Sequence, residues 1–390
     1  MAQKTKTRNI EIIYKLFFTI LLCFIVFNII SVVLPQRDKY LSTNYWQRFP
    51  SLKNAYYDSV YANKKGGFIP DETLYSFNGG ALVQGTSPIL VNPEIPPVGK
   101  YLIGLSILFF NNEHIIILFS AVISLIMLFL IGRQIFSSSL IALLPPFFLS
   151  LEPIFKNQLV YTPLLDIIHL MFLLFSFYFF NLALRKKKNI PLFFLLTSIA
   201  FGLFISTKFF GLGITVVLAF YAVLLLNKDK LRFITFSITL PVSVFVLLLS
   251  YMRVLIIGYQ LNKFLGIQKW VYWYNQGHLH FSFSVWPLLL FNKWFVSWDK
   301  KTLSDPQWLI TWPMLTVFSL AVVLLYILKK IPKKIEAEIL IAWIPFYLIF
   351  LSFGDANARY FVILIPIMYL VSVFGIKILI EKLLKHENLD

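Results

Sequence analysis

The run IEIIYKLFFTILLCFIVFNIISVVL, residues 10–34, is a largely apolar stretch of about 25 residues. It follows the basic residues Lys4, Lys6 and Arg8 and contains no Ala-x-Ala cleavage pattern. A secretory signal peptide has a shorter apolar core, about 7–15 residues, and ends at a small-residue cleavage site. A helix of about 20 apolar residues is long enough to cross a bilayer. The run therefore predicts an uncleaved transmembrane helix whose N-terminus lies inside.

The composition of the whole chain agrees with a membrane location. The 390 residues are 58% hydrophobic and 14% charged, with a mean hydropathy of +0.77. Soluble domains are about 45–50% apolar and about 25% charged, so this composition excludes a soluble globular domain. The chain has one cysteine, Cys23, which excludes an internal disulfide. We predict one multi-span domain over residues 1–390 and no separate soluble domain.

Nine further apolar runs approach the length that a membrane span needs. They are residues 114–135, 138–154, 163–184, 190–206, 209–226, 231–252, 307–328, 337–353 and 360–380. The run 101–110 is different, because at about 1.5 Å per residue it covers only about half a bilayer. If it does not cross, the basic connections 185–188 and 329–334 both lie inside, as the positive-inside rule requires. The sequence thus predicts an all-α integral membrane protein with about ten transmembrane helices and both termini cytoplasmic.

Two long outer loops are expected, residues 35–113 and 253–306, and the first should contain interfacial helices. The net charge is +17, from 35 Lys and Arg against 18 Asp and Glu. Many of the basic residues lie at the predicted inner ends, so the excess indicates topology and no nucleic-acid partner. Residue usage rich in Phe, Ile and Lys favours a bacterial plasma (inner) membrane, and the other expected partners are membrane lipids.

Several charged residues gather on the predicted outer face. They are Asp71 and Glu72 in FIPDETLYSFNGGA, Lys100 in NPEIPPVGKYLIGL, Asp166 with His169 one turn further, Lys208 in STKFFGLG, and Arg359. The acidic pair could instead be solvated or cap a helix, Lys100 could reach the lipid headgroups, and Asp166 could form an interhelical hydrogen bond. Lys208, between two spans too close together for a loop, has few such structural explanations. Asp166 and His169 alone are too few ligands for a metal site.

The second outer loop adds aromatic and histidine residues. Its candidates for substrate contacts are His278, His280, Trp286 in SVWP and Asp305 in SDPQW. The alternative is an interfacial aromatic belt, with histidines that form ordinary surface hydrogen bonds.

An acidic pair, a lysine and an arginine on one face fit an anionic lipid headgroup and a neutral acceptor. The chemistry that they favour is sugar transfer from a polyprenyl-phosphate donor. The phosphate leaves as a stable anion, whose charge Lys or Arg can stabilise, with a divalent cation (Mg or Mn) as a further option. A carboxylate then takes the proton of the attacking acceptor hydroxyl. A single displacement at the anomeric carbon inverts its configuration.

The motifs resemble those of the protein O-mannosyltransferases and their bacterial relatives, membrane glycosyltransferases of the GT-C type. In that family an Asp-Glu pair in the first outer loop precedes an HPPLGK-like motif by about twenty residues. Here PDETLYSF precedes NPEIPPVGKYLIGL, and LLDIIH, STKFFGLG, SVWP, SDPQW and Arg359-Tyr360 follow in the family's order. The motif's His position is Ile95, and the Asn expected before Pro-x-x-Trp is Asp305.

The resemblance implies roles for individual residues. Asp71 would be the catalytic carboxylate, with Glu72 assisting it. The donor phosphate and sugar would be bound by Tyr75, Lys100, Asp166, Lys208 and Arg359, and Glu94 would be a possible substrate contact together with the residues of the second outer loop. The acceptor stays open between protein Ser/Thr, a glycan and a lipid, and mannose is one of several possible sugars. The lipid A aminoarabinose transferases share the framework.

The alternative function is a multi-span transporter or lipid flippase. It would place ionisable residues near the middle of the membrane and would show internal repeats. The sequence shows no such repeat, and its unusual charges lie toward one face.

Overall fold

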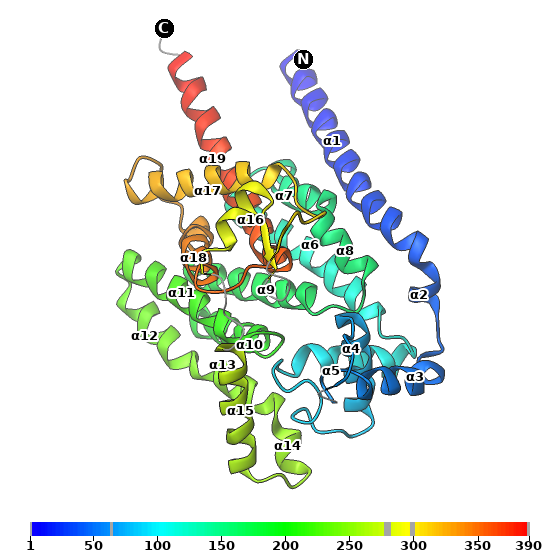
Figure 1. Ribbon diagram of the computed structural model, residues 1–390. Helices are drawn as coiled ribbons and strands as arrows, with labels where there is room; N and C mark the ends of the chain where they lie inside the picture. Colours follow the sequence, from blue (N-terminus) through cyan, green and yellow to red (C-terminus); the bar gives the residue numbers. More distant parts are fainter. Residues whose placement is uncertain (1, 63–64, 277–281, 297–300, 388–390) are drawn as a thin grey trace.

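The computed structural model describes residues 2–62, 65–276, 282–296 and 301–387. The described chain is helical apart from a pair of short antiparallel strands, β1 (Trp294–Val296) and β2 (Lys301–Leu303), with Phe295 opposite Thr302. Figure 1 shows long helices gathered around α9, with the shorter helices of the first outer loop at one end.

The N-terminal part contains one long helix and the helices of the first outer loop. They are α1 (Ala2–Val33), η1 (Leu34–Gln36), α2 (Arg37–Leu41), α3 (Tyr45–Tyr57), α4 (Asp71–Val83) and α5 (Val98–Phe110). The expected helices of this loop are thus present, and α5 has only 13 residues.

The central part runs from α6 to α13. Its helices are α6 (Ile115–Ile135), α7 (Ser139–Leu151), α8 (Pro153–Val160), α9 (Asp166–Arg185), α10 (Ile190–Ile205), η2 (Phe210–Leu212), α11 (Gly213–Asn227), α12 (Lys230–Thr239) and α13 (Pro241–Ser250). The α9 helix packs against α6, α10, α18 and α19. It is therefore the centre of the core.

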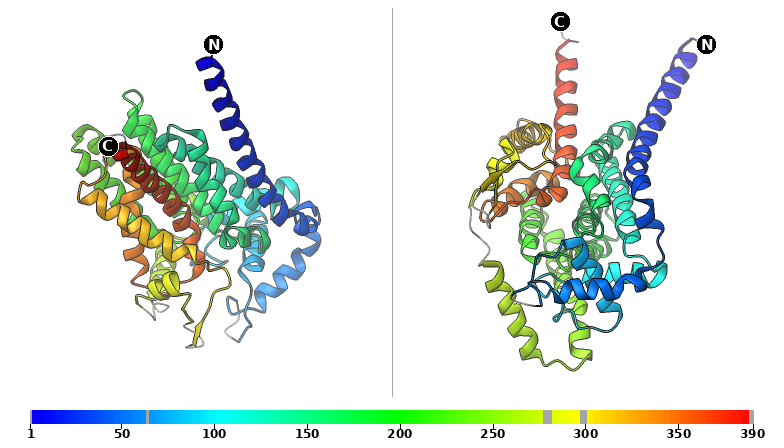
Figure 2. Two further views of the ribbon diagram at one scale, coloured as in Figure 1. Left: turned by 90° about the horizontal axis from the view of Figure 1, so that it is seen from above. Right: turned by 45° about the vertical axis from the view of Figure 1, so that its right-hand side comes forward.

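The C-terminal part completes the bundle. It consists of α14 (Met252–Ile256), α15 (Leu261–Gln276), α16 (Val285–Phe291), α17 (Thr311–Ile327), α18 (Ile335–Leu351), η3 (Ala358–Tyr360) and α19 (Phe361–Glu387). The two ends of the chain lie at the same end of the molecule, whereas α3, α5, α14 and α15 lie at the opposite end (Figures 1 and 2).

Six helical segments in the described chain are long and apolar enough to cross a membrane. They are Ile12–Leu41, Ile115–Ile135, Asp166–Arg185, Phe210–Asn227, Lys230–Ser250 and Ala358–Leu384. A seventh is formed if α7 and α8, bent by 59°, count as one span. The protein is thus a multi-pass integral membrane protein. Length and composition do not show the other three predicted spans, because α10, α17 and α18 have only 16, 17 and 17 residues.

Proline causes the bend between α7 and α8. Glu152 has extended backbone angles, φ −62° and ψ 127°, and Pro153 is the first residue of α8. The residue before a proline is pushed out of the helical region, while proline itself suits a first helical turn. The bend directs the chain toward the start of α9 and thus toward Asp166.

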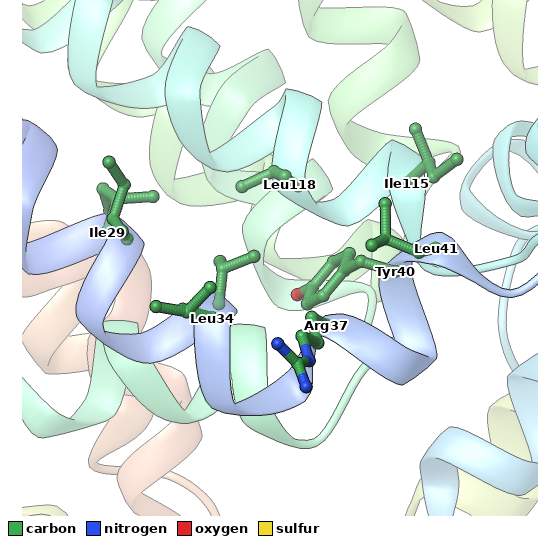
Figure 3. A pocket seen from close by; sticks show the side chains of 9 residues that line it. Ile29, Leu34, Arg37, Tyr40, Leu41, Ile115 and Leu118 are labelled. Carbon is green, nitrogen blue, oxygen red and sulfur yellow. The ribbon is translucent and has the colours of Figure 1, made fainter.

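A groove of about 340 Å³ lies between the end of α1, α2 and α6 (Figure 3). Its lining includes Ile29, Leu34, Tyr40 and Leu118, with Arg37 at one edge. It contains none of the charged residues that the sequence singles out. The candidate site is therefore elsewhere, where the structure brings those charges together.

Candidate active site

Arg359 lies between two aspartates from distant parts of the chain. Its Nη1 donates to Asp71, while its Nη2 and Nε donate to one carboxylate oxygen of Asp166 at 2.9 and 3.3 Å. Lys208 donates to the other oxygen of Asp166. We call Asp71, Asp166, Lys208 and Arg359 the ion cluster. It contains two carboxylates and two cations, so its formal charge is balanced.

Local structure at three helix starts places the members of the ion cluster. Asp71 is the first residue of α4, directly after the extended Pro70, and Asp166 is the first residue of α9. A carboxylate in the first turn interacts favourably with the positive end of the helix dipole. Arg359 lies in η3, where its backbone N–H donates to the side chain of Asn357 at 3.0 Å.

The ion cluster is only partly open to solvent. The side chain of Asp166 is 5% exposed, whereas that of Asp71 is 32% exposed. Buried charges are stable only when they are paired, which explains why two cations contact Asp166. The more exposed Asp71 is the member that a substrate can reach most easily.

Tyrosines border the ion cluster. Tyr75, one turn after Asp71 on α4, is almost fully buried, and burial followed by the charge of Asp71 raises its pKa well above the usual value. The Nζ of Lys208 lies 5.8 Å from the ring centroid of Tyr360, within cation–π range. No role was predicted for Tyr360 from the sequence, although the Arg359-Tyr360 pair of the family motif was an available signal for one. Because burial raises its pKa, Tyr75 stays protonated near neutral pH and can donate a hydrogen bond.

Glu72, the neighbour of Asp71, is half-buried and forms no hydrogen bond or ion pair within the described ranges. Its predicted role stays a prediction.

Lys100 lies in a separate buried group. Its fully buried ammonium donates to the carbonyl oxygens of Asn92 and Ile95, both at 2.8 Å, and to that of Val91 at 3.3 Å. Burial lowers the pKa of Lys100 to about 7, opposed by the charge of Glu94. Through its three hydrogen bonds, the ammonium of Lys100 holds the loop before α5 in place. Its predicted contact with the donor stays a prediction.

Only one of the two carboxylate oxygens of Glu94 has a hydrogen-bond partner among the described residues. That oxygen accepts a hydrogen bond from the side chain of Asn92. The buried Oε2 has no hydrogen-bond partner among the residues that the structure describes. Burial raises the pKa of Glu94, and the charge of Asp71 raises it further.

The candidates of the second outer loop form structural contacts outside the ion cluster. The indole of Trp286 donates to Ser352 at 3.0 Å, and Asp305 accepts from the backbone N–H of Gln307 at 2.8 Å. Burial raises the pKa of Asp305. His278 and His280 lie outside the described residues.

His169 does not extend the ion cluster into a metal site. Its ring stacks on Phe204 with centroids 3.9 Å apart. In the described part of the chain, no group of three or more His, Cys, Asp or Glu side chains could hold a metal ion.

Comparison with known proteins agrees with the resemblance read from the motifs. Residues 94–257 match the family described as dolichyl-phosphate-mannose-protein mannosyltransferase, which confirms that resemblance. No curated protein sequence matches the chain.

Solved structures share the fold. ArnT from Cupriavidus metallidurans in the apo state has 14% identity and a TM-score of 0.52, covering 84% of this chain and 59% of ArnT. The same protein bound to undecaprenyl phosphate has 14% identity and a TM-score of 0.51, with 86% and 60% covered. An oligosaccharyltransferase from Archaeoglobus fulgidus has 13% identity and a TM-score of 0.49, with 81% and 47% covered. The chain thus spans about three fifths of the length of ArnT, with which it shares its fold.

Proposed function

We propose that this chain, which matches the dolichyl-phosphate-mannose-protein mannosyltransferase family over residues 94–257, is an inverting membrane glycosyltransferase. It moves a sugar from a polyprenyl-phosphate donor to an acceptor hydroxyl or amine at the outer face of the plasma membrane. The observation that carries the proposal is the contact of Arg359 with both Asp71 and Asp166. A carboxylate able to take a proton and a cation able to hold a phosphate thereby share one site.

The proposed topology has ten crossings, with both termini cytoplasmic. The termini lie at the same end of the molecule (Figure 1), which supports an even number of crossings. The six long segments and the bent pair make seven. The short helices α10, α17 and α18 bring the count to ten, and α5 lies in the interface without crossing. The ion cluster then lies at the outer ends of α9 and α19.

Arg359 and Lys208 are the proposed phosphate ligands. The guanidinium presents several N–H donors in a fixed plane, an arrangement that matches phosphate oxygens. A donor phosphate placed there competes with Asp71 and Asp166 for the same N–H groups. Binding of the donor therefore loosens the hold of Arg359 on Asp71. It also places positive charge where the leaving phosphate develops its negative charge.

Asp71 is the proposed general base. The acceptor oxygen or nitrogen attacks the anomeric carbon from the face opposite the phosphate and forms the new glycosidic bond. The bond between that carbon and the phosphate oxygen breaks, and its electron pair leaves with the phosphate. The acceptor proton moves to Asp71. The configuration at the anomeric carbon is inverted, and no acid is needed for the leaving group.

Neighbouring groups orient the sugar and the acceptor. The protonated Tyr75 can donate a hydrogen bond to the phosphate or sugar, and the free oxygen of Glu94 can accept one from a sugar hydroxyl. We propose Glu72, His278, His280, Trp286 and Asp305 as further substrate contacts. Mannose is the sugar that the family description suggests, and protein Ser/Thr, a glycan or a lipid is the acceptor.

The test is the substitution Asp71→Asn, which nearly preserves shape but removes the base. Purified protein in bilayer vesicles is supplied with a labelled polyprenyl-phosphate sugar and membrane extract as acceptor. We expect transfer to fall by about 10²-fold or more, the usual contribution of a general base. Asp38→Asn changes a fully exposed aspartate of the same loop and should transfer normally. Wild-type transfer by Asp71→Asn would refute the role of Asp71.

The transporter alternative is decided by the same vesicles. Movement of labelled lipid across the bilayer without formation of a glycosylated product would support it and exclude the glycosyltransferase. Mass spectrometry of the product then identifies the acceptor.

A further inference from the structure

A second buried charge lies outside the ion cluster, at the turn between α5 and α6. The carboxylate of Glu113 is fully buried, and Nη2 of Arg48 on α3 donates to both of its oxygens at 2.9 Å. The hydroxyl of Ser76 on α4 donates to it at 3.2 Å, and Nε2 of His114 lies 3.3 Å away. We call Glu113, Arg48, Ser76 and His114 the Glu113 cluster. None of these residues has a role in the mechanism above.

The Glu113 cluster contacts the helix that carries Asp71. Ser76 follows Asp71 by little more than one turn of α4. The backbone carbonyl of Ser76 also accepts a hydrogen bond from the buried hydroxyl of Tyr45 at 2.7 Å. Glu113 thereby holds the side chain of Ser76, and Tyr45 holds its backbone carbonyl. Rotation or sliding of α4 would break both contacts.

The same turn is tied to the segment that leads to Asp166. The ring of His114 packs edge-on against that of Tyr40, with centroids 6.2 Å apart. The hydroxyl of Tyr40 donates to the carbonyl of Leu159 at 2.7 Å, in the last turn of α8. Asn112 donates to the carbonyls of Lys39 and Ser42 at 2.7 and 2.8 Å. The turn at residues 111–114 thus links α4 with the connection between α8 and α9.

A buried carboxylate fixes geometry more sharply than apolar packing does. Its desolvation costs several kcal/mol unless its hydrogen bonds are made, so few arrangements of its neighbours are stable. Catalytic groups must be held within about 0.5 Å of their productive geometry. We propose that Glu113 is a positioning residue, which holds α4 so that Asp71 faces Arg359, the arginine that also contacts Asp166 at the start of α9. This inference rests on the proposed function for its kinetic consequence, but its structural consequence can be measured independently.

The structural test uses two spin labels. Phe68 precedes α4 and Tyr161 follows α8, and both are largely exposed. In a Cys23→Ser background, labels at Phe68→Cys and Tyr161→Cys report the distance from the start of α4 to the approach of α9. We expect Glu113→Gln to broaden or shift this distance distribution. Arg48→Gln, at a residue whose side chain is 39% exposed, should do the same and serves if Glu113→Gln does not fold.

The matched control breaks another partly buried ion pair. Arg185 and Glu336 are 3.1 Å apart and connect the end of α9 to the start of α18. Glu336→Gln should leave the label distance unchanged. Unchanged distributions in folded Glu113→Gln and Arg48→Gln, or an equal change in Glu336→Gln, would overturn the inference.

The kinetic test separates positioning from donor binding. Misplacement of a catalytic group by about 1 Å can cost about 10²-fold in rate, so kcat should fall by about that factor while the donor KM stays within about twofold. A raised donor KM with unchanged kcat would contradict a positioning role. If the wild-type protein transfers no sugar, the proposed function fails, whereas the label distances still decide the role of Glu113.

Discussion

Asp71 and Arg359 form an ion pair although 288 positions separate them in the sequence. Asp71 is the first residue of α4, and Arg359 lies in η3, just before α19, the last helix of the bundle. The pair therefore fastens the outer loop to the C-terminal part of the chain. It also brings a proposed base into contact with a proposed phosphate ligand, so substitutions on either side should affect both stability and donor use.

Arg359→Lys should raise the donor KM by about tenfold and lower the unfolding temperature in detergent. Lysine keeps the charge, but its single ammonium lacks the planar set of donors that reaches two carboxylates or two phosphate oxygens. Donor saturation curves and thermal unfolding measure the two effects. Arg37→Lys, at an exposed arginine outside the ion cluster, is the control. An unchanged donor KM would contradict a phosphate contact at Arg359.

Lys208→Ala should weaken donor use more than it weakens the fold. Asp166 keeps its hydrogen bonds from Arg359 when Lys208 is removed. The donor KM should rise by about tenfold, equivalent to about 1.4 kcal/mol. Lys53→Ala, at an exposed lysine of α3, should leave the saturation curve unchanged. Donor saturation equal to that of the wild type would rule out the proposed contact.

Lys100→Met should lower the unfolding temperature and leave the donor KM unchanged. The substitution removes the ammonium that donates to the carbonyls of Asn92 and Ile95, and a buried carbonyl left unsatisfied costs about 1–3 kcal/mol. Thermal unfolding in detergent and donor saturation are compared in the same preparation. The opposite result, a raised donor KM with unchanged stability, would show that Lys100 contacts the donor as the family resemblance implies.

Stability should fall as the pH decreases from about 6.5 to about 4, and His114 should contribute to the fall. Burial lowers the pKa of His114 from 6.5 to about 4, although Glu113 opposes this and Arg48 and Lys39 add to it. Between these values the unfolded chain binds a proton that the folded chain does not, so acid favours unfolding. His114→Asn should flatten the dependence of unfolding temperature on pH in this window. A profile parallel to that of the wild type would contradict the expectation.

The fold class was predictable because apolar run length and basic connections depend on local sequence. The helix α1 and the short α5 were predicted from a few neighbouring residues, whereas the run 138–154 was predicted as one span and instead bends by 59° before Pro153. The count of ten spans was harder to support, because α10, α17 and α18 are shorter than the bilayer is thick. The resemblance to a family was also readable from the sequence, because it rests on short motifs in a fixed order along the chain, and residues 94–257 match the family model.

The candidate site was predictable in part. Asp166, Lys208 and Arg359 were singled out by their place beside predicted spans, and Asp71 by its motif in the first long loop; the structure brings all four together. Arg48 and Glu113 were missed, although a glutamate in NNEH directly before an apolar run was an available signal. A charge beside a span is visible in sequence, but the partner that it finds is not.

The sequence by itself determined that the chain lies in a membrane, which runs are apolar enough to cross it, and which charges are unusual beside them. These follow from hydrophobic burial and from the cost of charge in lipid, which depend on residue type and on neighbours along the chain. Only the tertiary structure decided the pairings: Arg359 with Asp71 and Asp166, Lys100 with its own loop. A buried charge is stabilised by any partner that the packing places within hydrogen-bond distance. A partner of Lys100 lies five positions away in the sequence, whereas a partner of Arg359 lies 288 positions away.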